Sequence, residues 1–194
     1  MTPEREQKLK QVIQNRQQGV VVLEDIHDPH NAAAILRSCD AFGIQKICFI
    51  FEKEKRFNPR RIGHLSSASA SKWLDMEFFT STIKCLSTLK RRGYYIIATA
   101  LDEKAKDFRK ADLTRPKTVL MFGNEYRGLS IKAQKLAHET VYIAMKGLVQ
   151  SLNLSVTAAV CLAELDRQRA QKKAKNRYFL TKLEQGRLLK KWSA

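Results

Sequence analysis

The sequence is poor in cysteine, proline and glycine, which limits the classes of protein it can belong to. Its 194 residues include four cysteines, four prolines and eight glycines. The cysteines are scattered and form no CxxC pair, which excludes a disulfide framework and indicates reduced thiols in an intracellular protein. Sparse proline and glycine, together with the lack of an internal repeat, indicate no flexible interdomain linker.

Long apolar runs and several common ligand motifs are also missing. No segment approaches the roughly 20 apolar residues of a membrane span, and the amino terminus is charged where a secretory signal is apolar. We therefore expect a cytoplasmic protein with no membrane partner. The GxGxxG, Walker and GxSxG motifs do not occur. His27 and His30 have no further ligands at metal-binding spacing, so no metal site is predicted.

Acidic residues are in the minority, and this imbalance is the first positive indication of function. The 36 Lys and Arg residues against 19 Asp and Glu give a formal charge of +17. Such a charge favours a polyanionic partner, because contacts with phosphates release counterions. Nucleic acid is the first candidate, and a basic surface that serves only solubility is the alternative. The 44% hydrophobic content is sufficient for one sizeable core.

Short β-rich segments alternate with segments of helical periodicity. Strands are expected at 20–23, 46–51, 94–100, 118–122 and 140–144, and helices at about 32–42, 82–92, 131–137 and from 154 to beyond 169. This alternation predicts an α/β fold in which helices cover both faces of a mainly parallel sheet.

The two ends of the chain differ from this central domain, which we assign to residues 19–166. Residues 1–18 predict a polar helical extension, and residues 167–194 predict a basic one that holds ten Lys or Arg residues and one acidic residue. Leucines and Trp192 in the basic extension indicate a short amphipathic helix that packs on the body or on a second subunit. A solvated, fraying terminus is the alternative.

Three polar insertions interrupt apolar segments that are far apart in the chain. They hold Asn31 and Arg37 in NAAAILRSCDAFG, Glu125 in LMFGNEYRGLS, and Ser151 and Asn153 in IAMKGLVQSLNLSVTAAV. Polar groups in such surroundings need partners when they are buried. We therefore expect the three insertions to assemble into one site.

Each insertion also has an ordinary structural explanation. Asn31 is expected to cap a helix that carries Arg37, which either pairs with Asp40 or faces a substrate. The second insertion follows a strand, where α/β proteins usually bind ligands, and its glutamate could orient Arg37 or hold a helix. In the third, Ser151 or Asn153 is expected to cap the long helix that follows.

Basic residues outside the insertions are candidates for RNA contacts. In KEKRFNPRR, Arg56, Arg60 and Arg61 are expected to hold phosphates while Phe57 stacks on an unpaired base. The alternative is a charged connecting loop, and the small residues at 67–71 that follow are placed near substrate. The basic extension adds Arg167, Arg169, Lys172 and Lys173.

The three insertions resemble, in order and spacing, the signature motifs of the SpoU/TrmH family of RNA ribose 2'-O-methyltransferases, over most of residues 20–169. The resemblance implies the SPOUT class of α/β fold, with a deep trefoil knot near the carboxyl terminus. It also implies S-adenosyl-L-methionine as methyl donor and a homodimer with the knot region at its interface.

The resemblance further implies a role for each insertion. Arg37 acts on the 2'-hydroxyl, either as proton acceptor or as a cation that stabilises the alkoxide. Asn31, Ser151 and Asn153 face ribose and phosphate, and Glu125 supports the site. The residues implied to line the donor pocket are Thr99, Ala100, Leu101, Gly123, Ile143, Met145 and Leu152.

Within the family, the short extensions and the DxxRP element at 112–116 look most like the tRNA guanosine-18 enzymes, which implies a tRNA D-loop guanosine as substrate. Ala144 departs from the usual proline of the family, which predicts a less restrained donor loop. Two alternatives stay open: ribosomal RNA or a tRNA wobble nucleotide as substrate, and a non-catalytic RNA-binding protein on the same fold.

Overall fold

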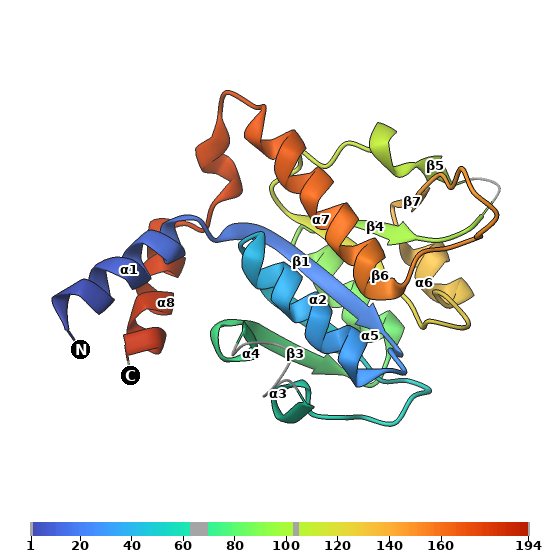
Figure 1. Ribbon diagram of the computed structural model, residues 1–194, viewed down its shortest axis with the longest axis horizontal. Coiled ribbons are helices and arrows are strands. Elements are labelled where there is room, and N and C mark those ends of the chain that lie inside the picture. The colour runs from blue at the N-terminus through green and yellow to red at the C-terminus, as the bar shows by residue number, and fades with distance from the viewer. Residues whose placement is uncertain (1, 63–69, 103–104, 194) are drawn as a thin grey trace.

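A single seven-stranded sheet, with every pair of neighbouring strands parallel, forms the centre of the molecule (Figure 1). The computed structural model describes residues 2–62, 70–102 and 105–193. The strand order is β3-β2-β1-β6-β4-β7-β5. The strands are β1 (Gln17–Glu24), β2 (Ile44–Ile50), β3 (Asp75–Phe79), β4 (Tyr95–Thr99), β5 (Lys106–Asp107), β6 (Thr118–Phe122) and β7 (Glu139–Tyr142).

The helices comprise eight α-helices and two short 3-10 turns within the described ranges. They are α1 (Pro3–Gln14), α2 (Pro29–Ala41), α3 (Pro59–Ile62), α4 (Ala70–Trp73), α5 (Thr82–Arg91), α6 (Ile131–Leu136), α7 (Leu154–Ala170), α8 (Lys182–Ser193), η1 (Phe108–Lys110) and η2 (Lys175–Tyr178). The side chain of Arg61 and residues 67–69, both named in the sequence analysis, lie outside the described residues.

Helices cover both faces of the sheet, as the sequence predicts. Along β1, Val21 and Leu23 belong to one buried cluster with residues of α2 and α7, whereas Val20 and Val22 belong to another with residues of α5 and α6. Successive side chains of a strand point to opposite faces, so a strand buried on both faces is a continuous apolar run. Figure 1 shows α2 and α7 lying side by side on one face.

Helix α2 begins earlier than the sequence analysis expects. Asp28, not Asn31, is its N-cap, and the Asp28 side chain accepts a hydrogen bond from the His30 N–H at 2.8 Å. Pro29 follows as the first helical residue, a position where its fixed φ is favourable and its missing N–H costs nothing. Asn31 therefore lies inside the first turn, and its side chain is available for contacts with other segments.

The two ends of the chain pack against each other as helices α1 and α8 (Figure 1). A small apolar cluster of Leu9, Ile13, Leu188 and Trp192 joins them, and Trp73 of α4 contacts Trp192 edge-on at 5.2 Å between ring centroids. The basic extension is therefore a packed element in this structure. None of the described helices is long and apolar enough to cross a membrane.

Candidate functional site

A cavity of about 580 Å³ lies at the carboxyl ends of β4, β6 and β7. Most of its wall comes from four segments: the end of β4 and the residues after it, the turn after β6, the end of β7 and the residues after it, and the loop that leads into α7. All seven residues expected in the donor pocket line it, together with Glu125, Ser151 and Asn153. The volume is within the range of about 300–1,000 Å³ that small-molecule sites occupy.

The turn after β6 requires glycine at its first position. A Cβ atom on Gly123 would lie 2.3 Å from the backbone of Gly128 and Leu129. The turn is closed by two reciprocal hydrogen bonds, from Asn124 N to Gly128 O at 3.1 Å and from Gly128 N to Asn124 O at 2.9 Å. Gly128 has a φ of +63°, which also favours glycine. The backbone itself therefore forms this part of the cavity wall.

Asn124 fixes this turn to the end of β1. Its side-chain oxygen accepts from the N–H groups of Tyr126 and Arg127, both at 3.0 Å, and its amide donates to the Asp25 carbonyl at 2.8 Å. Asp25 has a φ of +51°, and its carboxylate accepts from the backbone N–H groups of residues 52–54. The sequence pattern does not indicate this role of Asp25, because its partners are backbone groups far along the chain.

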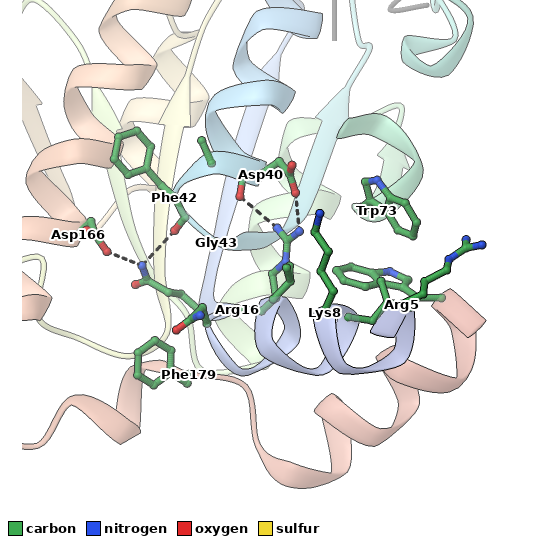
Figure 2. A pocket seen from close by; sticks show the side chains of 15 residues that line it. Arg5, Lys8, Arg16, Asp40, Phe42, Gly43, Trp73, Asp166 and Phe179 are labelled. Carbon is green, nitrogen blue, oxygen red and sulfur yellow. Dashed lines mark hydrogen bonds and ion pairs between the residues drawn. The ribbon is translucent and has the colours of Figure 1, made fainter. Parts of the chain in front are cut away.

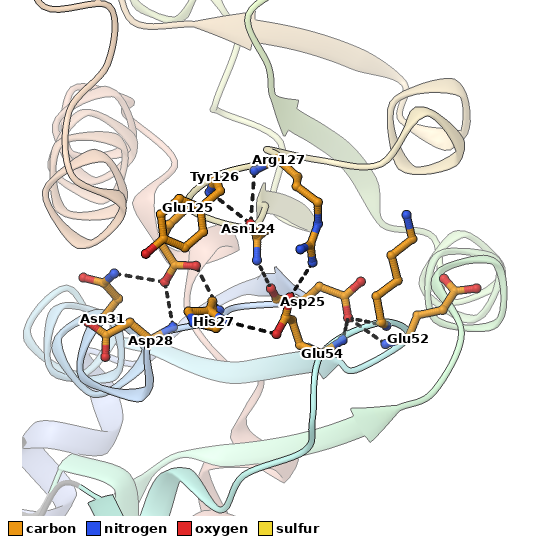
Figure 3. A network of polar contacts seen from close by, with 11 residues as sticks. Asp25, His27, Asp28, Asn31, Glu52, Glu54, Asn124, Glu125, Tyr126 and Arg127 are labelled. Carbon is orange, nitrogen blue, oxygen red and sulfur yellow. Dashed lines mark hydrogen bonds and ion pairs between the residues drawn. The ribbon is translucent and has the colours of Figure 1, made fainter.

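Glu125 connects the second insertion to the first (Figure 3). Its carboxylate accepts from the backbone N–H groups of His27 at 2.9 Å and Asp28 at 3.1 Å, and from the side-chain amide of Asn31 at 2.9 Å. Negative charge at a helix N-terminus interacts favourably with the helix dipole. Glu125 therefore holds the start of α2, one of the two roles that the sequence left open for it.

Asn31 connects this pair to the third insertion. The carboxylate of Glu125 can only accept hydrogen bonds, so the NH2 group of Asn31 points toward it. The side-chain oxygen of Asn31 then accepts a hydrogen bond from the amide of Asn153 at 3.2 Å. Asn153 is also the N-cap of α7, accepting from the N–H groups of Ser155 and Val156. The expected helix cap is confirmed, and all three insertions meet in one hydrogen-bonded network.

Arg37 lies on the same helix as Asn31, nearly two turns further on, and its side chain is exposed. Neither residue is among those that line the cavity, although Asn31 contacts two that do. The carboxylate of Asp40, the pairing partner considered for Arg37 from sequence, is bound by the buried guanidinium of Arg16. The helix thus connects Arg37 to the polar network.

Acidic side chains around the site hold neighbouring loops together (Figure 3). Glu54 accepts from Arg127 at 2.5 Å and contacts His27 Nδ1 at 3.1 Å, and these hydrogen bonds, the Arg127 bond foremost, hold the pKa of Glu54 below its ordinary value. Glu52 pairs with Lys132 at 2.7 Å, which is the main reason that its pKa falls to about 2. These carboxylates are ionised at neutral pH and fix the loop after β2.

The basic loop after β2 lies beside this network. Arg56 is exposed, with its guanidinium 4.6 Å from the centroid of the Phe78 ring, and Arg60 is exposed on α3. Phe57 is half-buried and packs edge-on against Phe51 at 5.1 Å. The ring expected to stack on a base instead attaches the loop to the core, and the arginines remain at the surface.

The four basic residues predicted for the tail separate into two groups. Arg167, Lys172 and Lys173 are exposed, although Arg167 also pairs with Glu164 at 2.7 Å. Arg169 is 2% exposed, and its guanidinium donates to five oxygens, those of Leu113, Gln17, Gln18, Arg115 and Pro116. The prediction that Arg169 binds RNA is therefore wrong: this guanidinium ties the end of α7 to the start of β1.

The arrangement is suited to group transfer between two organic substrates. A partly apolar cavity can hold one of them, and the polar network with exposed Arg37 offers amides and a cation to the other. Among the described residues, no group of three or more His, Cys, Asp or Glu side chains is placed to hold a metal ion. The side chains on this part of the molecule can orient reactants and stabilise developing negative charge.

Comparison with known proteins places this arrangement in context. The sequence profile of the SpoU rRNA Methylase family matches residues 18–163. The chain is 40% identical over 171 residues to the tRNA (guanosine(18)-2'-O)-methyltransferase of Thermus thermophilus, covering 87% of this chain and 84% of the relative.

Solved structures of related enzymes resemble this chain in fold. The TrmH/SpoU tRNA modifying enzyme of Aquifex aeolicus has a TM-score of 0.85 and 34% identity, covering 98% of this chain and 95% of that one. The SpoU methyltransferase AviRb of Streptomyces viridochromogenes, in complex with the cofactor AdoMet, has a TM-score of 0.70 and 26% identity, covering 84% and 62%.

Proposed function

Because the chain belongs to the SpoU rRNA Methylase family, we propose that it transfers the methyl group of S-adenosyl-L-methionine to a ribose 2'-oxygen of RNA, and that its substrate is guanosine 18 of tRNA. The family relationship and the named tRNA relative support the chemistry and the substrate. One observation carries the proposal: the Glu125–Asn31–Asn153 network brings the three insertions together beside a cavity of suitable size.

The cavity fits the methyl donor. Gly123 leaves backbone where any other residue would place a Cβ, and Ile143 and Leu152 provide apolar surface. When bound, S-adenosyl-L-methionine supplies an electrophilic methyl group on a sulfonium. The residues that would hold it are Thr99, Ala100, Leu101, Gly123, Ile143, Met145 and Leu152.

The acceptor ribose is bound on the side of α2. Asn31, Ser151 and Asn153 present amide and hydroxyl groups that orient the ribose and its phosphate. A guanidinium has N–H donors and no acceptor, so Arg37 acts as a cation that stabilises the 2'-oxygen while this oxygen loses its proton. Glu125 already accepts three hydrogen bonds and therefore positions α2.

The RNA extends beyond the target nucleotide onto basic surfaces. The exposed residues that can neutralise phosphates are Arg56 in the loop after β2, Arg60 on α3, and Lys172 and Lys173 after α7. The four cysteines are free and buried, which suits the reducing compartment in which tRNA is modified. We therefore assign the enzyme to the cytoplasm.

A second copy of the chain and a trefoil knot complete the proposed architecture. Leu148 and Val149 in the loop before α7, and Val156 and Val160 one turn apart on α7, are large apolar residues exposed in the single chain. Burial of this surface against a second copy removes apolar area from water. The same loop, wrapped around the donor cavity, is where the knot is proposed. Val160→Arg should convert a dimer to a monomer in light-scattering measurements.

The proposed function is tested by incubating the protein with methyl-labelled donor and, separately, bulk tRNA and ribosomal RNA. We expect label on tRNA, at the ribose of guanosine 18, and its loss with Arg37→Ala. Label confined to ribosomal RNA would replace the substrate assignment while keeping the chemistry. Donor binding without label on either RNA would contradict the proposal and favour a non-catalytic RNA-binding protein.

A further inference from the structure

A second cavity, of about 770 Å³, lies between the terminal helices and the body (Figure 2). It is at the amino ends of the strands: Gln17 begins β1, Gly43 precedes β2 and Trp73 precedes β3. The donor cavity is at the carboxyl ends. The two cavities therefore lie at opposite ends of the sheet, in which β1 alone spans eight residues, or about 25 Å. The proposed methyl transfer assigns no role to this second cavity.

Aromatic rings from four separate segments line this cavity. They are Phe42 after α2, Trp73 in α4, Phe179 after η2 and Trp192 in α8. The guanidinium carbon of Arg16 also lies over the Trp192 ring, 5.1 Å from the ring centroid. Aromatic rings of this kind stack with nucleobases in proteins that bind single-stranded nucleic acid.

Cations lie at the rim of the same cavity. Arg5 and Lys8 are exposed residues of α1, three positions apart, and Figure 2 shows Lys8 extending from α1 across the opening. Residues three apart are neighbours on a helix surface. Cations on one helix beside a ring-lined cavity are suited to a phosphate attached to a stacked base.

The inner wall supplies fixed hydrogen-bonding groups. Gln17 donates to the Phe42 carbonyl at 3.0 Å and to the Asp166 carboxylate at 2.8 Å, and Asp40 is held by Arg16. Carboxylates held in this way can accept from the amino group of a base. Within the described ranges, the buried donors Arg16 Nε and Trp192 Nε1 have no acceptor, which is costly unless something else supplies one.

We propose that this cavity binds a ribonucleotide, with the base among the aromatic rings and the phosphate on Lys8 and Arg5. Rings alone would suit many apolar ligands, and cations alone would suit any anion. A nucleotide uses the rings for its base and the cations for its phosphate, and the exocyclic amino group of the base uses the acceptors. We infer that the ribonucleotide belongs to an RNA chain, and this inference rests on the proposed function. Binding of a free mononucleotide to the cavity does not depend on the proposed function.

The chain has two tryptophans, and both line this cavity, so intrinsic fluorescence reports its occupancy without a label. The full chain is titrated with guanosine, adenosine, cytidine and uridine 5'-monophosphates, and separately with tRNA. We expect saturable quenching that is weakest for uridine, which has no exocyclic amino group. Tighter quenching by tRNA than by guanosine monophosphate supports RNA as the source, and the reverse order supports the free nucleotide. No quenching by any of these ligands overturns the proposal.

A matched pair of variants shows whether binding occurs in the cavity. Lys8→Gln removes a rim cation, and Lys10→Gln removes an exposed cation of the same helix that pairs with Glu6 and does not line the cavity. We expect a loss of nucleotide affinity of about tenfold for Lys8→Gln and less than twofold for Lys10→Gln. Equal losses would overturn the proposal. If quenching is normal but RNA receives no methyl group, only the proposed function fails.

Discussion

The side-chain amide of Asn31 donates to the Glu125 carboxylate at 2.9 Å, although the two residues are 94 positions apart in the chain. The same carboxylate accepts from two backbone N–H groups at the start of α2. The turn after β6, which forms a wall of the donor cavity, thus sets the position of the helix that carries Arg37. In the proposed reaction, this connection aligns the methyl donor with the acceptor ribose.

Replacement of Asn31 by Asp should separate alignment from donor binding. The new carboxylate faces that of Glu125 and cannot donate to it, so the start of α2 is repelled. We expect methyl transfer to fall at least about 100-fold, whereas the Kd for the donor changes less than threefold because Asn31 does not line the cavity. Single-turnover kinetics and calorimetry measure the two quantities. A parallel loss of donor affinity would show that Asn31 maintains the cavity itself.

Replacement by Ala should lower the free energy of unfolding at Arg169 but not at Arg167. Burial lowers the pKa of Arg169 to about 10, so it remains charged at neutral pH and satisfies five oxygens. We expect Arg169→Ala to lower the free energy of unfolding by about 3 kcal/mol or more, since several acceptors lose their donor. Arg167→Ala should leave it nearly unchanged. Urea unfolding compares them, and equal stabilities would contradict the structural role of Arg169.

Glu52 gives a prediction about acid sensitivity. Its pKa is lowered from 4.5 to about 2, chiefly by the hydrogen bond from Lys132. A carboxylate with a depressed pKa stabilises the fold above its ordinary pKa, and this contribution is lost as the pH falls from about 4.5 to about 2. Lys132→Gln should raise the Glu52 pKa, followed by carboxyl NMR, and move acid unfolding to higher pH. Lys135→Gln, an exposed change on the same helix, should do neither.

The exposed lysines after α7 should affect RNA binding through charge alone. Changing both Lys172 and Lys173 to Gln should weaken binding to all RNA sequences and reduce the slope of log K against log salt by about 1–2. Donor affinity should not change. An unchanged slope would show that these lysines do not contact phosphates. Substitution tests this better than truncation at residue 167, which would also remove Arg169 and the packing of α8 on α1.

Local pattern was sufficient to predict five of the strands, because runs rich in β-branched, aromatic and apolar residues favour strands. It did not predict β3, which mixes acidic and apolar residues, or β5, which has two residues. The convergence of Asn31, Glu125 and Asn153 was predicted, since each interrupts an apolar segment. The Asp28 cap was missed although Pro29 after it is a recognisable signal.

Other features depend on packing that sequence pattern does not encode. Arg169 counts as one more charge in a basic tail, and only the fold shows it buried among carbonyl groups. Asp25 acts through backbone groups of residues 52–54, which have no sequence signature. The ring-lined cavity likewise draws its wall from both ends of the chain and from four elements between them, β1, α2, α4 and α7.

The proposed methyl transfer can be measured directly at the ribose of guanosine 18 in tRNA. A 2'-O-methyl group blocks alkaline cleavage of the adjoining phosphodiester, so treated tRNA is hydrolysed and its fragments are separated after incubation with the protein and S-adenosyl-L-methionine. We expect a gap in the cleavage ladder at that nucleotide with the unaltered chain and an unbroken ladder with Arg37→Ala. An unbroken ladder with both proteins, or a gap that persists in the variant, would contradict the proposal.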